Sequence, residues 1–137
     1  MAAVEELIRT ESDGSISFGN HSLQEKAKKE GFESSGDIYK VKTYATMTKL
    51  EKNGLFLYES VPGTSVSSLR ESADGMSFVV SGGGDAQITV GLTEETDYNV
   101  NVDGTDVGRM TTNMGGKLVL SLELSEGEEK KVDITKA

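Results

Sequence analysis

Apolar and polar residues alternate with a period of two through most of the second half of the chain. The apolar positions are Ala86, Ile88, Val90 and Leu92, then Tyr98, Val100 and Val102, then Leu118, Leu120, Leu122 and Leu124, and finally Val132 and Ile134. Successive side chains of a β-strand point to opposite faces, so this spacing predicts strands with one buried and one solvated face. Such strands are typical of antiparallel sheets.

Pairs of turn residues separate these alternating segments at short intervals. The pairs are Asn53-Gly54, Asp74-Gly75, Asp103-Gly104 and Gly115-Gly116. Residue pairs of this kind supply the positive φ angles of tight hairpins, so each pair predicts a hairpin corner. Pro62-Gly63 predicts a type II turn with Gly63 in the left-handed region. Leu55–Tyr58 is apolar on both faces and predicts a strand near the middle of a sheet.

The pattern as a whole predicts an all-β fold, an antiparallel β-sandwich of Ig-like or jelly-roll-like type. Residues 22–30 allow two interpretations. Ser22 and Glu25 fit a capping box, and Glu25 and Lys29 form an i,i+4 pair, which together favour at most one short helix there. The alternation over residues 25–32, followed by Ser35-Gly36 and a strand-like segment at 38–43, favours a hairpin instead, and we prefer the hairpin.

Length and composition predict one folded domain spanning residues 1–137. The chain is 35% hydrophobic and 27% charged, which places it among globular proteins. Charge is unevenly distributed, since residues 21–60 hold seven basic and six acidic side chains (net +1) and residues 71–137 hold five and thirteen (net −8). This shift offers an alternative boundary near residue 70, between two sheets or subdomains.

The overall charge narrows the classes of partner. A formal net charge of −9 repels the phosphate backbone of nucleic acids and anionic membrane surfaces, so we expect neither as a partner. No apolar run approaches the roughly 20 residues that span a bilayer. The N-terminus carries Glu5 and Glu6 where a secretion signal needs basic residues, so we expect a cytoplasmic protein.

Candidate catalytic chemistry is sparse. The chain has no cysteine and one histidine, His21, which lies in a polar, turn-like stretch and which we interpret as an incidental surface residue. A Ser-His-Asp triad built on His21 is therefore not expected. The glycines at 82–84 lack the Gly-Lys-Ser/Thr ending of a phosphate-binding loop and predict a flexible strand connection. We expect no catalytic residues, no cofactor-binding residues and no cofactor.

A weak cation site is the remaining metal candidate. The segment 99–104, Asn-Val-Asn-Val-Asp-Gly, matches the start of a calcium loop, but Met110 stands where a bidentate glutamate should close the cage. We therefore expect no EF-hand calcium site and no bound metal of that kind. The weak candidates for a different cation site are the polar residues Asp97, Asn99, Asn101 and Asp103, which would share one face of a strand.

Two resemblances to known families extend this picture. Residues 98–104, Val107-Gly108, Thr111 or Thr112, residues 116–118 and residues 124–128 resemble the closing hairpins of Ig-like β-sandwich modules appended to bacterial carbohydrate-active enzymes. Residues 18–20, 36–43, 49–54 and 58–64 resemble short proteins of anaerobic bacteria that carry the name endosialidase. The second resemblance implies cleavage of polysialic acid, and it brings no site residues to this chain.

Three functional hypotheses follow. The first is a non-catalytic β-sandwich that binds or assembles through its surface, with a protein or glycan partner. The second is a glycan-directed, endosialidase-like enzyme or an accessory carbohydrate-binding domain. Stacking platforms for sugars need exposed rings, which Tyr39, Tyr44 and Tyr58 would have to supply. The third is a structural homo-oligomer in which edge strands pair between chains and the basic middle segment meets the acidic C-terminal one.

Overall fold

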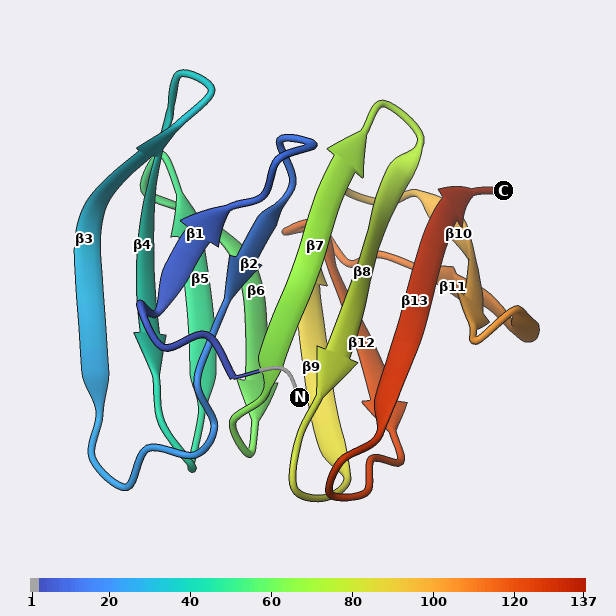
Figure 1. Ribbon diagram of the computed structural model, residues 1–137. Coiled ribbons are helices and arrows are strands. Elements are labelled where there is room, and N and C mark those ends of the chain that lie inside the picture. Colours follow the sequence, from blue (N-terminus) through green and yellow to red (C-terminus); the bar gives the residue numbers. More distant parts are fainter. Residues whose placement is uncertain (1–2) are drawn as a thin grey trace.

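The computed structural model describes residues 3–137, and within them it contains thirteen β-strands and no helix (Figure 1). The strands are β1 (Ile8–Thr10), β2 (Ile16–Phe18), β3 (Ala27–Ser34), β4 (Asp37–Thr43), β5 (Thr48–Lys52), β6 (Leu55–Val61), β7 (Ser65–Ser72), β8 (Gly75–Ser81), β9 (Ala86–Gly91), β10 (Asp97–Val102), β11 (Thr105–Thr111), β12 (Lys117–Leu122) and β13 (Glu129–Lys136). The all-β prediction is confirmed.

The strands form two antiparallel sheets that pack face to face as a β-sandwich (Figure 1). Sheet A has the order β1-β2-β7-β8-β13-β10-β11, and sheet B has the order β12-β9-β6-β5-β4-β3. The chain crosses from one sheet to the other several times, so both sheets mix strands from the two halves of the sequence. Residue 70, the alternative boundary, lies inside β7.

The hairpin interpretation of the N-terminal third is confirmed, and the helix near residues 22–30 does not form. Residues 27–34 pair with β4, from Ala27 opposite Thr43 to Ser34 opposite Asp37. Ser35 and Gly36 close the hairpin with φ angles of 51° and 86°, as a two-residue turn with positive φ at both positions requires. Pairing with β4 therefore outweighs the local capping signal at Ser22 and Glu25.

Two of the turn predictions are wrong. Gly115-Gly116 does not close a hairpin, because β11 belongs to sheet A and β12 to sheet B. A Cβ at Gly116 would lie 2.3 Å from the carbonyl oxygen of Leu92, so the glycine permits a close crossing between the sheets. The turn at Pro62-Gly63 follows a cis Val61–Pro62 bond, and Gly63 lacks the positive φ of a type II turn.

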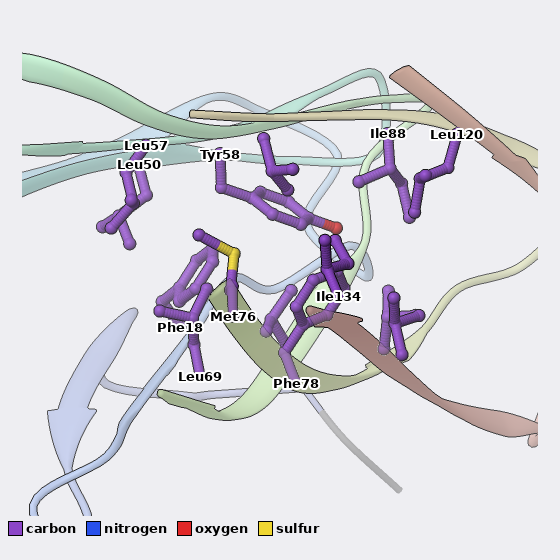
Figure 2. Packing of buried hydrophobic residues seen from close by; sticks show 14 of the residues in the cluster. Phe18, Leu50, Leu57, Tyr58, Leu69, Met76, Phe78, Ile88, Leu120 and Ile134 are labelled. Carbon is purple, nitrogen blue, oxygen red and sulfur yellow. The ribbon is translucent and has the colours of Figure 1, made fainter. Parts of the chain in front are cut away.

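The core lies between the sheets and follows the predicted alternation. Tyr58 of β6 is fully buried at its centre, with its ring edge-on to Phe18 of β2 (centroids 5.2 Å apart) and to Phe78 of β8 (5.7 Å). Figure 2 shows these three rings together with aliphatic side chains from both sheets. β6 lies in the interior of sheet B as predicted, but its first residue, Leu55, is 72% exposed.

Candidate functional site

The four residues predicted as weak cation ligands lie on β10 and in the turn that follows it. Both carboxylates of this set accept hydrogen bonds within the fold: Asp97 Oδ1 from the Thr111 hydroxyl (2.5 Å) and Asp103 Oδ1 from the Lys131 backbone N–H (2.8 Å). Asn99 and Asn101 lie between them on the solvent-facing side of sheet A. Residues 3–137 contain no group of three or more His, Cys, Asp or Glu side chains arranged to hold a metal ion.

His21 contacts a serine, but that serine is closed to solvent. His21 Nδ1 lies 2.7 Å from Ser65 Oγ, which also accepts a hydrogen bond from the His21 backbone N–H at 3.3 Å. Ser65 has no exposed surface, so a substrate cannot reach its hydroxyl. The pair therefore joins the segment after β2 to the start of β7.

The tyrosines offer little flat surface to a sugar. Tyr58 is fully buried and Tyr39 is 6% exposed. Tyr44 is partly exposed, and the Lys26 ammonium lies 5.9 Å from its ring centroid. Of the three rings named as candidates for a stacking platform, only Tyr44 therefore reaches the surface to any extent.

Neither a family model, nor a curated protein, nor a solved structure matches this chain. No helix among residues 3–137 is long and apolar enough to cross a membrane.

The two lateral sides of the sandwich differ. At one side, β1 of sheet A contacts β3 of sheet B, and the Thr10 hydroxyl donates a hydrogen bond to Ser34 Oγ at 2.7 Å. At the other side, the edge strands β11 and β12 flank a groove of about 630 Å³. Its lining is mainly apolar: Val100, Val102, Val107, Met110, Val119, Leu120 and Leu122, with Ser121, Glu123 and Lys130 beside them. Among these lining residues Val107 and Val119 are exposed, whereas Val100, Leu120 and Leu122 are buried.

The four edge strands also differ in length and regularity, and these two properties decide how well an edge can pair with a strand of another chain. The pairing of β3 with β4 shifts register between Lys29 and Phe32, and that of β10 with β11 shifts after Val100. β1 has three residues. Bulges and short strands are the devices by which natural proteins protect sheet edges. β12 pairs with β9 over six residues without a register shift, so among the described strands it is the regular edge of more than three residues.

The hydrogen bonds at the start of β12 show which of its backbone groups are free. Leu92 N–H donates to the Gly116 carbonyl (2.7 Å), so Gly116 points its carbonyl toward β9. Lys117 points the other way, since its N–H donates to Asn113 Oδ1 (3.0 Å) and its carbonyl accepts from the Asn113 N–H (3.1 Å). Orientation alternates along an antiparallel strand, so Val119 and Ser121 direct N–H and C=O away from β9.

The side chains of this edge are suited to a contact. Val119 is 49% exposed on the outer face of sheet B, whereas Leu118, Leu120 and Leu122 are buried on the inner face. Across the groove, Val107 of β11 is 48% exposed. The sequence pattern predicts the alternation of β12 but not its position at an edge. Residues 117–123, Lys-Leu-Val-Leu-Ser-Leu-Glu, comprise β12 and the residue after it and carry opposite charges at the two ends, a signal visible in the sequence.

Proposed function

We propose that this protein is a non-catalytic β-sandwich that functions in assembly, by adding an extended polypeptide strand to the free edge of β12. The observation that carries the proposal is the regular edge at Val119 and Ser121, with unpaired backbone groups beside an apolar groove. In strand addition, main-chain hydrogen bonds supply affinity, and pockets for alternate side chains supply specificity. Both elements are present on this side of the sandwich.

The surroundings of the chain's ionisable and aromatic residues favour assembly over glycan chemistry. The one histidine contacts a serine without exposed surface, and two of the three candidate tyrosines are buried. A second pocket lies at the start of β6, where Leu55, Phe56 and Leu57 line it, and it contains the ion pair between Lys52 Nζ and Glu71 Oε2 (2.8 Å). The pKa of Lys52 is raised because the lysine donates a hydrogen bond to Glu71, which favours its charged form.

Titration of the isotope-labelled protein with a short peptide in which threonine and leucine alternate tests the proposal. Strand addition at β12 should perturb the amide resonances of Val119 and Ser121 more than those of Leu118 and Leu120, whose N–H groups already face β9. The control is the same peptide with a central proline, which cannot continue a ladder. Absence of a response to both peptides in a monomeric sample would contradict strand addition.

A glycan array and a hydrolysis assay on sialic-acid polymers test the glycan-directed alternative on the same preparation. The proposal expects neither binding nor turnover. Turnover at enzyme-like rates that is lost on changing a single carboxylate would overturn the non-catalytic assignment. In that case the endosialidase resemblance would become the leading hypothesis.

A further inference from the structure

We infer that the strand added to β12 is β12 of a second copy of this chain, paired antiparallel about a two-fold axis at Leu120. The inference rests on the proposed function, and it specifies the partner and the register. In this register the numbers of two facing residues add up to 240. Val119 therefore lies opposite Ser121 of the second copy. The two six-stranded sheets would then continue into one another.

The hydrogen-bonding pattern of the edge matches this register. Val119 and Ser121 are the residues whose N–H and C=O groups face outward, and the two-fold axis places each against the other. Each of these two residues donates its N–H to the carbonyl of the other. Together they form a hydrogen-bonded pair of an antiparallel ladder. Leu120 faces its own copy across the axis as a non-hydrogen-bonded pair, in which side chains approach more closely.

The side chains are self-complementary in the same register. Lys117 and Glu123 are both exposed, and neither forms an ion pair within the described part of the chain. The Lys117 ammonium lies 4.6 Å from the Phe56 ring centroid, and in this register the residue lies opposite Glu123 of the second copy. Leu118 would lie opposite Leu122 on the inner face. Shifting the two-fold axis by one residue in either direction removes the contact between Lys117 and Glu123. Opposite charges placed across neighbouring strands are favourable, and like charges are unfavourable.

The groove also has a place in this arrangement. A two-fold axis perpendicular to sheet B keeps the inner faces of both copies on the same side. The groove of one copy would then face the groove of the other, so that Val107 and Met110 of both copies border a shared apolar space. A contact that reduces the exposure of Val107 and Val119, at 48% and 49%, is favoured by the hydrophobic effect.

The other edges are less suited to pairing between copies. β3 carries a bulge, with Gly31 at a φ of 69°, and Glu30 of that strand forms ion pairs with Lys28 (3.9 Å) and Lys40 (3.4 Å). A head-to-tail contact between β12 and β3 would also repeat without closing and produce filaments. The two-fold pairing closes at two copies.

The decisive experiment is charge reversal with rescue, followed by sedimentation velocity at low salt over a range of concentrations. Wild type should form a dimer of twice the chain mass. Lys117→Glu or Glu123→Lys alone places like charges together at both ends of the contact, and each should weaken the dimer at least tenfold. The double variant Lys117→Glu/Glu123→Lys restores both pairs and should restore the dimer. A double variant that stays monomeric would overturn the register.

The matched controls are Glu25→Lys, in an exposed segment before β3, and Lys29→Glu, on the opposite edge strand. Neither should change the dimer. Loss of assembly on Lys29→Glu would show pairing through β3 and overturn the inference. Val119→Pro removes an outward-facing N–H, a position where an edge strand tolerates proline, and should yield a folded monomer.

The outcomes separate the two proposals. If wild type is monomeric throughout but the alternating peptide perturbs Val119 and Ser121, the second copy is the wrong partner and strand addition stands. If wild type is dimeric and amide exchange at Val119 and Ser121 slows as the dimer forms, both stand. A monomer that ignores the peptide would contradict both.

Discussion

The phenol oxygen of Tyr58 lies 2.7 Å from the hydroxyl oxygen of Thr64, and neither residue has exposed surface. Thr64 follows β6 in the connection to β7, where the chain passes from sheet B to sheet A. Its hydroxyl also lies 2.7 Å from Ser60 Oγ, and its carbonyl accepts a hydrogen bond from the Thr48 hydroxyl at 2.7 Å. The crossover is therefore attached to sheet B by buried polar contacts, which satisfy groups that would otherwise be costly to bury.

Tyr58→Phe tests the contribution of this network. The substitution keeps the ring contacts with Phe18 and Phe78 and removes the hydrogen bond to Thr64. The Thr64 hydroxyl keeps its hydrogen bond with Ser60. We expect the free energy of unfolding to fall by about 1 kcal/mol, the usual net value of one hydrogen bond. Urea denaturation measures it, with Tyr44→Phe, at a partly exposed position, as the control. Equal losses in the two variants would contradict a specific role for the buried phenol.

The local part of the fold could be predicted from the sequence because its causes are local. Alternation between buried and exposed positions requires only a period of two, and it identified the strands around Ile88, Val100 and Leu120. The positive φ angles at Asn53-Gly54 and Asp103-Gly104 likewise belong to the residues in the turns themselves. These predictions are confirmed.

The assignment of strands to sheets could not be predicted, since it depends on contacts between distant residues. Gly116 begins a crossing because of its approach to Leu92, a residue more than twenty positions away. The candidate site was missed for the same reason. An edge strand is one without a neighbouring strand on one side. The alternation of apolar and polar residues carries no information about neighbouring strands, so the sequence does not distinguish Val119 from other outward-facing residues.

Val100→Asp is expected to abolish folding. Val100 has no exposed surface and lies between sheet partners on both sides, Gly108 of β11 and Ile134 of β13. A carboxylate at this position would be buried without a charge partner, at a cost comparable to the whole stability of a domain this size. Leu120→Asp, at 3% exposure, should behave likewise. Circular dichroism during heating measures the effect.

The control is Val61→Asp, because Val61 is 54% exposed at the end of β6 and a carboxylate there stays in water. This variant should melt cooperatively, close to wild type. Cooperative melting of Val100→Asp and Leu120→Asp at the wild-type temperature would show that the inward faces of β10 and β12 are misassigned.

Ser81→Ala is expected to stabilise the protein. The Ser81 hydroxyl is shielded from solvent, and it has no hydrogen-bond partner among residues 3–137. A buried hydroxyl without a partner carries a desolvation cost of roughly 1–3 kcal/mol, so its removal should raise the melting temperature. Ser60→Ala, which removes a hydroxyl that is paired with Thr64, should lower it. Destabilisation by Ser81→Ala would indicate a bound partner at this hydroxyl.

Ionisation of Glu11 makes the free energy of unfolding depend on pH in the acid range. Its carboxylate accepts hydrogen bonds from the Ser17 hydroxyl and from Arg9 Nε, the latter at 2.9 Å. The pKa of Glu11 is lowered below its ordinary value of 4.5, first by the Ser17 hydrogen bond and then by Arg9. The ionised form is favoured in the folded state, so the stabilisation is present above pH 4.5 and is lost as the pH falls through the lowered pKa.

Glu11→Gln should therefore be less stable than wild type near neutral pH, and the difference should shrink as the solution is acidified below pH 4.5. The loss should stay at or below about 1 kcal/mol, because the contact with Arg9 is partly exposed and screened. Urea denaturation at a series of pH values measures it, with Glu25→Gln in an exposed segment as the control. A difference between Glu11→Gln and wild type that stays constant with pH would show that ionisation of Glu11 is not coupled to folding.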